Sequence, residues 1–316
     1  MSDVDSSSSA TVDSALLNQF ARGFLDQHRR ELRWRRFWRI VWLLVAAAVI
    51  WAAIQSTPSS TAPSTPHTAL VEVRGAIASD SETNADNLMT ALRSAFEAAG
   101  SRAVVLRINS PGGSPVQAGL VNDEVRRLKA LHKKKVYAVC EEMCASAAYY
   151  IAVAADQIYV DKASLVGSIG VLMDGFGFVG TMDKLGVERR LMTAGTNKGM
   201  LDPFSPRQPE QEAFAQAMLD QIHQQFIQVV RQGRGKRLKE TPETFSGLFW
   251  NGQQAVSAGL ADQLGSLDQV ARDVVKASDI IDYTQKENLA ERLAKRFGAA
   301  IGNGVVQSLR ASITVR

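Results

Sequence analysis

Ser146 stands in the stretch EEMCASAAYY (141–150), between a short apolar run that predicts a strand and a segment that predicts a helix. A serine hydroxyl at such a junction can act as the nucleophile in acyl transfer. A small residue in an Ala-Ser-Ala sequence at a helix start can equally pack against a neighbour or cap the helix. The stretch by itself leaves both interpretations open, so the rest of the chain has to supply a base.

Histidine, the usual partner of a catalytic serine, is poorly placed in this chain. The sequence has four histidines, and none lies in a glycine-rich loop after a strand, where its ring would be aimed at a nucleophile. His28 lies in the N-terminal tail, His67 in a linker, His132 at a helix end and His223 within a helix. The last two are expected on solvated faces. A Ser-His-Asp triad is therefore disfavoured.

Lysine can replace histidine as the base when its surroundings keep it neutral, because burial lowers the pKa of an ammonium group. Lys198 lies in MTAGTNKGMLDPF (192–204), among small and apolar residues and with no acid within three positions. It is a candidate base, with an exposed turn lysine as the alternative. Ser168, in SLVGSIGVLM (164–173), carries a hydroxyl that can orient such a lysine or bond to the backbone.

Two adjacent glycines, Gly112 and Gly113, occur in RINSPGGSPV (107–116), after an expected strand and before an expected helix. Glycine lets the backbone adopt unusual dihedral angles and approach a substrate closely, and N–H groups at such a junction can bind an oxyanion. The alternative is an ordinary tight turn. The spacing matches neither a Walker A motif nor a dinucleotide fingerprint.

An apolar run, IVWLLVAAAVIWAAI (40–54), follows a cluster of six arginines between residues 29 and 39. With Phe37 and Trp38 the run is just long enough to span a bilayer, which predicts a transmembrane signal anchor over 37–54. A cleaved signal peptide is the alternative, but the preceding segment of about 36 residues is long for one. The positive-inside rule places 1–36 in the cytoplasm and the rest of the chain outside it. Membrane orientation thus explains the basic cluster better than nucleic-acid binding does.

The remaining chain divides by composition. Residues 55–68 read as a Ser/Thr/Pro linker, 69–284 as the folded domain and 285–316 as a C-terminal amphipathic helix or tail. Within the domain, strands alternate with helices, which indicates an α/β fold with a mainly parallel sheet. We expect strands at 69–77, 102–109, 136–140 and 157–161, helices at 84–99, 114–131 and about 145–155, and a long helix with one apolar face at about 208–232. The two cysteines, Cys140 and Cys144, are too few for a disulfide framework or a metal site, and we expect buried thiols rather than a disulfide.

Four motifs occur in a specific order: RINSPGGSP (107–115), CASAAYYIAVAADQIYVDKASLVGSIGV (144–171), GVERRLMTAGTNKGMLDPF (186–204) and LFWNGQQAVSAGLADQLG (248–265). With them, residues from about 68 to 275 resemble the signal peptide peptidase A family of membrane-anchored serine proteases, in its short bacterial form. The resemblance implies a Clp protease/crotonase-like fold and a Ser-Lys dyad. Ser146 is then the nucleophile, Lys198 the general base and Ser168 the lysine-orienting hydroxyl. Gly113, with Gly112 beside it, supplies the oxyanion N–H.

The same resemblance implies the setting of this chemistry. It calls for no cofactor or metal, and for a homo-oligomeric ring, an octamer, in which neighbouring copies contribute serine and lysine. It implies that the substrates are leftover signal peptides and other membrane-released peptides, at a bacterial inner membrane, with a single-pass anchor and an extracytoplasmic catalytic domain.

The chain departs from the family pattern beside the nucleophile. Two glycines commonly follow that serine, whereas Ala147 and Ala148 follow it here, and Cys144 replaces a small or aromatic residue. The added methyl groups put the size of acceptable substrates in doubt. Two other interpretations remain: a catalytically silent membrane-anchored scaffold, and a crotonase-like enzyme acting on acyl-CoA esters, for which no anchor is expected.

Overall fold

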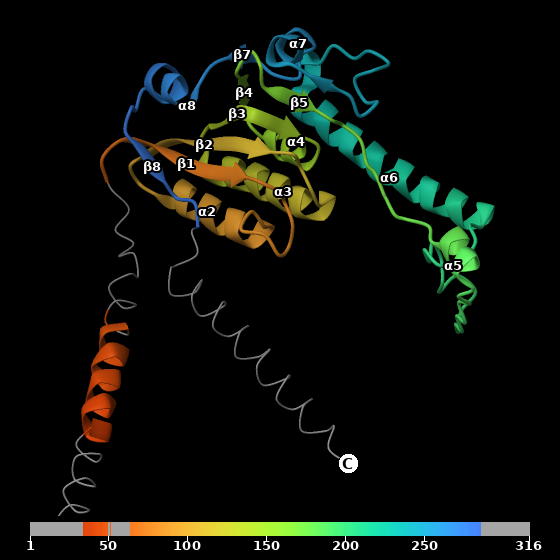
Figure 1. Ribbon diagram of the computed structural model, residues 1–316. Helices are drawn as coiled ribbons and strands as arrows, with labels where there is room; N and C mark the ends of the chain where they lie inside the picture. The colour runs from red at the N-terminus through yellow and green to blue at the C-terminus, as the bar shows by residue number, and fades with distance from the viewer. Residues whose placement is uncertain (1–33, 50, 52–63, 286–316) are drawn as a thin grey trace, which may run out of the picture. The chain divides into compact units, whose positions relative to one another are not determined.

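The computed structural model describes residues 34–49, 51 and 64–285, which fall into two units (Figure 1). In the first unit, residues 34–49 form a helix. No helix among the described residues combines the length and the apolar composition needed to cross a bilayer. The expected anchor over 37–54 extends beyond the described residues, and most of the expected tail, linker and C-terminal helix lies outside them.

The second unit is an α/β domain, as the alternation of strands and helices predicts. Its elements in chain order are β1 (His67–Arg74), α2 (Ala85–Glu97), β2 (Ser101–Ser110), α3 (Pro115–His132), β3 (Val136–Ala145), α4 (Ala147–Ala152), β4 (Gln157–Val160), β5 (Leu165–Gly167), α5 (Val179–Leu185), α6 (Pro209–Arg234), η1 (Gly235–Arg237), β6 (Phe249–Trp250), α7 (Gly252–Ser257), β7 (Gln263–Leu264), α8 (Leu267–Gln269), η2 (Val270–Val275) and β8 (Ile280–Asp282). β1 begins at His67, two residues inside the expected linker.

The sheet runs in the order β6-β5-β3-β2-β1-β8, and β4 and β7 branch from β3. Every strand pair is parallel except β5 with β6, which is antiparallel. The apolar side chains of β2 alternate between two cores, with Val104 and Leu106 in the main core and Val105 in a smaller one that contains Val270 of η2. Helices α2, α3, α4 and α6 contribute to the main core, which fixes the face of the sheet on which the helix after Ser146 lies.

β3 is longer than the apolar run 136–140 predicts, because the strand continues through Glu141 to Ala145. Its first half pairs with β4 and its last three residues pair with β5. The change of partner coincides with a bulge. Ile108 of β2 pairs with Cys140 of β3, and Ser110 pairs with Cys144. A step of two residues along β2 therefore matches a step of four residues along β3. Such bulges often redirect a strand end near a functional site, and here the redirected end leads directly into Ser146.

Candidate active site

Ser146 occupies a sharp turn between β3 and α4. Its backbone has φ 53° and ψ −122°, a conformation that costs a non-glycine residue about 1–3 kcal/mol unless its surroundings impose it. The Ser146 N–H donates to the Gly167 carbonyl (2.8 Å), and the Ser146 carbonyl accepts from the Tyr150 N–H (2.9 Å). The side chain does not cap α4 and is partly exposed. The turn therefore presents a hydroxyl instead of using it as a cap.

Gly112 packs directly against this turn. It has φ +106°, and a Cβ at this position would lie 2.7 Å from the Ser146 Cβ and 2.8 Å from the Ala145 carbonyl oxygen. Gly113 has φ +148°, and its Cβ would lie 2.1 Å from the Ile77 carbonyl oxygen. A side chain at Gly112 would displace the backbone around Ser146, and one at Gly113 would displace the backbone of Ile77.

The N–H groups around Ser146 differ in their availability. The Gly112 N–H donates to the Ser110 hydroxyl (3.1 Å), whereas the exposed Gly113 N–H has no hydrogen-bond acceptor within the described part of the chain. Ala147, the first residue of α4, has an N–H without an acceptor inside its helix. Sequence reasoning named Gly113 and missed Ala147. The signal for Ala147 was its position, because the residue after a nucleophile at a strand-to-helix turn commonly donates to the oxyanion.

Ser168 lies beside Ser146 because β5 pairs with β3. Ala145 faces Gly167 in the parallel register, so the two serines are the next residues to leave the sheet. Ser168 also has a positive φ, 51°. Its N–H donates to the Leu248 carbonyl (2.8 Å), and its own carbonyl accepts from the Gly170 N–H (2.9 Å). Within the described residues its hydroxyl has no hydrogen-bond partner, so it is available to another group.

Lys198 is not brought to this site within one chain. It is exposed and lies in a turn of residues 171–208, a segment that we call the arm. Contacts internal to the arm organise it: the Phe178 and Phe204 rings stack (5.3 Å), and Arg189 lies over the Phe204 ring (5.4 Å). Figure 1 shows α5, the helix of the arm, at the N-terminal end of α6, far from β3 and α4. Ser146, Ser168, Gly112 and Gly113 therefore gather at one place, and Lys198 does not.

The alanines after Ser146 are both buried in the main core. Ala147 is 4% exposed and Ala148 is fully buried. Their methyl groups thus pack inside the domain, and the departure from the two family glycines leaves the exposed side of Ser146 open.

Three histidines differ from expectation. His132, expected on a solvated face, is half-buried with its ring centroid 5.7 Å from that of Phe96. His67, expected in the linker, is buried at the start of β1, where its Nδ1 lies 2.8 Å from the Thr65 carbonyl oxygen and its Nε2 2.9 Å from the Tyr283 hydroxyl. His223, expected on a solvated face, is half-buried and bonded to the Ile169 carbonyl oxygen. The expectation fails because periodicity places a residue on a helix face without showing which loop covers that face.

The two cysteines are free and buried, as expected. Burial raises the pKa of the Cys144 thiol, and the neighbouring Cys140 thiol raises it further. A raised pKa disfavours the Cys144 thiolate, the form that binds metals. Among the described residues no cluster of His, Cys, Asp and Glu is suited to a metal ion.

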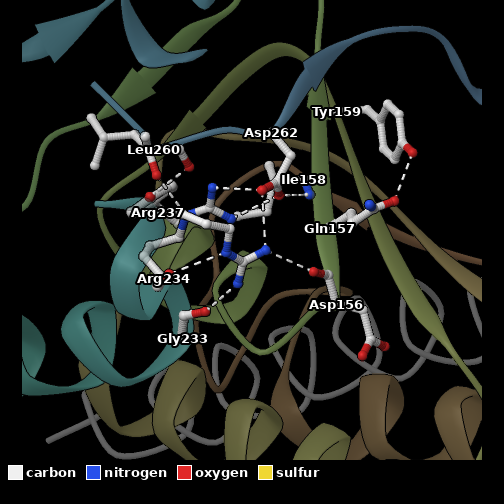
Figure 2. A network of polar contacts seen from close by, with 11 residues as sticks. Asp156, Gln157, Ile158, Tyr159, Gly233, Arg234, Arg237, Leu260 and Asp262 are labelled. Carbon is white, nitrogen blue, oxygen red and sulfur yellow. Dashed lines mark hydrogen bonds and ion pairs between the residues drawn. The ribbon is translucent and has the colours of Figure 1, made fainter. Parts of the chain in front are cut away.

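A buried ion-pair network fixes the C-terminal end of α6 to the core (Figure 2). Arg234, only 1% exposed, donates from both terminal nitrogens to the Asp262 carboxylate (2.8 and 2.9 Å) and from Nε to the Gly259 carbonyl (2.7 Å). Asp262 also accepts from the Ile158 N–H (2.7 Å) and from Arg237 (3.0 Å). Helix α6 thus runs from an anchored end beside β4 to the arm.

Comparison with known proteins decides the family. The family model "Peptidase family S49" matches residues 129–280. A "Putative protease" of Methanocaldococcus jannaschii is 32% identical over 217 residues, which cover 66% of this chain and 68% of that protein. The chain belongs to peptidase family S49. A "Putative signal peptide peptidase SppA" of Enterococcus faecium is 29% identical, over 66% of this chain and 64% of that protein.

These S49 relatives support a serine peptidase of the SppA family, and the mostly parallel α/β sheet fits a Clp-protease-like fold. A stretch of higher identity, 47% over 176 residues, occurs in a "Na(+)/H(+) antiporter NhaA" of Brucella melitensis. It covers 56% of this chain but only 24% of that protein. The chain thus spans about a quarter of the length of that relative, and the antiport activity in that protein's name is not assigned to this chain.

Proposed function

We propose that this protein is a serine endopeptidase that uses a Ser146–Lys198 dyad. Neutral Lys198 accepts the Ser146 proton as Oγ bonds to the peptide carbonyl carbon, and the N–H groups of Gly113 and Ala147 stabilise the oxyanion. The C–N bond then breaks as the lysine gives the proton to the leaving amine. Lys198 next deprotonates a water that attacks the acyl-enzyme, which releases the second product and restores the serine. Ser168 orients the lysine by accepting a hydrogen bond.

The backbone of Ser146 is the observation that carries this proposal. A non-glycine residue at φ 53° and ψ −122° between a strand and a helix is a strained conformation of the kind found at functional sites. The same turn lies against Gly112 and beside two N–H groups that can receive an oxyanion. A packing serine has no need of this arrangement.

The base comes from a neighbouring copy in this proposal. Lys198 is exposed in the arm, and the arm also exposes large apolar side chains such as Phe176 (80%) and Met192 (94%). Apolar surface of this kind marks a contact with another chain. A second copy seated against the arm would bury that surface and desolvate the lysine at the same time. We propose a closed homo-oligomeric ring, an octamer, as the resemblance implies.

The substrates and the location follow from the family resemblance and the N-terminal sequence. We propose leftover signal peptides and other membrane-released peptides as substrates. The run 37–54 would anchor the chain in a bacterial inner membrane, with the peptidase domain on the extracytoplasmic side, because its arginines lie on the N-terminal side.

Peptide hydrolysis by the full chain in detergent tests the dyad. We expect casein and signal-sequence peptides to be cleaved, and Ser146→Ala and Lys198→Ala each to lose at least about a thousandfold in kcat. A serine-reactive phosphonate should label Ser146 in the assembled wild-type protein.

Three results would contradict the proposal. An assembled protein that resists the phosphonate would favour a silent scaffold. A Lys198→Ala variant with full activity would remove the dyad. Hydrolysis of acyl-CoA esters in place of peptides would favour the crotonase-like reaction.

A further inference from the structure

Helix α6 touches both sides of the catalytic centre. Its Phe226 ring lies 5.1 Å from the Tyr150 ring of α4, the helix that begins after the nucleophile. Near its end, Gly233 approaches Val153 so closely that a Cβ there would lie 2.2 Å from the Val153 carbonyl oxygen. His223, three residues before Phe226, reaches the other side, where its Nε2 lies 3.0 Å from the Ile169 carbonyl oxygen.

The loop that His223 reaches contains Ser168. Ile169 is fully buried, and the residue before it, Ser168, is held at φ 51°. A backbone in this region persists only when its surroundings impose it. On one side the Ser168 N–H is bonded to the Leu248 carbonyl. On the other side, the His223 imidazole of α6 contacts the Ile169 carbonyl. The loop is thus held between Leu248, the residue before β6, and α6, and its two bonds lie on consecutive residues.

We propose that His223 is a positioning residue for the Ser168 hydroxyl. The carbonyl of Ile169 can only accept, so the His223 Nε2 carries the proton and donates, which both the neutral Nε2–H tautomer and the imidazolium form can do. That bond holds the peptide unit between Ile169 and Gly170, one residue after Ser168, and so restrains the backbone that carries the Ser168 hydroxyl. The inference rests on the proposed function, in which Ser168 orients Lys198. Because its Nε2 donates this hydrogen bond, the half-buried His223 cannot use that nitrogen as the catalytic base.

A second route to the same chemistry has to be separated from this one. Helix α6 also carries the arm, which gives a change at His223 a second route to catalysis, through Lys198 rather than Ser168. If each site takes its serine from one chain and its lysine from the next, the two routes affect different sites. A change at His223 that acts through Ser168 affects the site with the same chain's Ser146, whereas one that acts through Lys198 affects the neighbouring chain's site. Mixed oligomers of Ser146→Ala and Lys198→Ala chains then regain activity. In each restored site the serine comes from the Lys198→Ala chain and the lysine from the Ser146→Ala chain.

Placing His223→Leu in one chain of this mixture distinguishes the routes. On the Lys198→Ala chain, which supplies Ser146 and Ser168, we expect it to lower the restored kcat by about tenfold to a hundredfold, the scale of a misplaced catalytic group. On the Ser146→Ala chain, which supplies only the lysine, we expect no change. That second mixture also shows that a chain with His223→Leu folds and assembles. The reverse pattern, or equal losses in both mixtures, would overturn the proposal.

A conservative substitution tests the hydrogen bond itself in the otherwise unchanged protein. Glutamine offers an N–H donor at a similar reach, so His223→Gln should keep kcat within about threefold of wild type while His223→Leu loses about tenfold or more. Gln228→Leu, at an exposed position of the same helix, is the matched control and should retain activity. Equal losses for His223→Gln and His223→Leu would reject the donor role.

The two proposals fail in different ways. If the Ser146→Ala and Lys198→Ala chains do not restore each other, the dyad between copies is wrong. The comparison of His223→Gln with His223→Leu in the wild-type background then still decides whether the donor to Ile169 supports catalysis.

Discussion

At the scale of single residues, the site depends on a backbone contact that leaves no room for a side chain. Gly112 lies so close to Ser146 that an added Cβ would stand 2.7 Å from the serine Cβ, and its φ of +106° strains any other residue. We expect Gly112→Ala to lower kcat by about a hundredfold, since it moves the nucleophile or the oxyanion donors. Hydrolysis of a fluorogenic peptide measures this.

Gly119 provides the matched control for that substitution. It lies in α3, and a Cβ there meets no atom within 4 Å. Gly119→Ala should leave kcat unchanged and stabilise the helix by about 1 kcal/mol, because alanine has the higher helix propensity. If the Gly112→Ala enzyme is as active as the Gly119→Ala enzyme, the close approach of the loop has no catalytic role.

The sequence singles out candidate site residues but does not predict their geometry. The motif order singles out Ser146, Ser168 and the glycine pair, and the structure gathers these residues. The strained φ angles of the two serines are invisible in the sequence, because serine rarely adopts them and nothing local requires them. The N–H of Ala147 is missed for a related reason, since a backbone donor leaves no mark in side-chain identity. The separation of Lys198 from Ser146 depends on the path of the arm, which no periodic pattern encodes.

At the scale of elements, the regular helices and strands follow the sequence closely. Expected helices at 84–99 and 114–131 correspond to α2 and α3, within two residues at each end. The short strands β5 and β6 and the continuation of β3 were missed, because pairing rather than propensity forms them. The apolar face expected along 208–232 is buried only toward the C-terminal half of α6, and Phe214 near its start is exposed.

The ion pair between α2 and α3 makes part of the stability depend on pH. Hydrogen bonds from Arg127, and then from Arg93 of α2, lower the pKa of Glu124 to about 2 despite its burial. A carboxyl whose pKa is depressed in the folded state stabilises the protein above its ordinary pKa near 4.5, and this contribution is lost as the pH falls toward 2. We expect Glu124→Gln to lower the free energy of unfolding at pH 6 and to lower it by a clearly smaller amount at pH 2.5. Urea denaturation at both pH values tests this, and a constant difference between them would contradict it.

The anchored end of α6 should be a major contributor to stability. Burial by itself raises the pKa of Asp262, but the hydrogen bonds and charge of Arg234 outweigh it, so the pKa lies below its ordinary value. Removing the carboxylate leaves the guanidinium buried without its partner. We expect Asp262→Ala to lower the free energy of unfolding by about 3 kcal/mol or more. Asp273→Ala, which breaks the exposed pair with Arg272, is the control and should change little. Similar values for the two variants would show that the network does not hold α6.

At the scale of the whole molecule, one chain contains an incomplete site and an uncovered surface. In the proposed mechanism the missing group is the base, since Lys198 lies in the arm while Ser146, the proposed nucleophile, directly follows β3. The uncovered part is the same arm, where the large apolar side chains Leu172, Phe176, Leu185 and Met192 are each more than 70% exposed. If the arm of one copy rests on the peptidase domain of the next, a single contact both supplies the base and covers the apolar side chains. Assembly and catalysis should then be inseparable.

A charge in the apolar surface of the arm tests this coupling. Met192 is 94% exposed in the single chain, so Met192→Glu costs nothing in its folding, but a glutamate buried at an interface carries a desolvation penalty. We expect Met192→Glu to shift the protein to smaller species in size-exclusion chromatography with light scattering, and to abolish peptide hydrolysis. Gln253→Glu, on α7 outside the arm, should leave the mass and the activity unchanged. A Met192→Glu protein that dissociates yet remains active would place a base within one chain. One that stays assembled and active would show that this side chain of the arm does not face a neighbour.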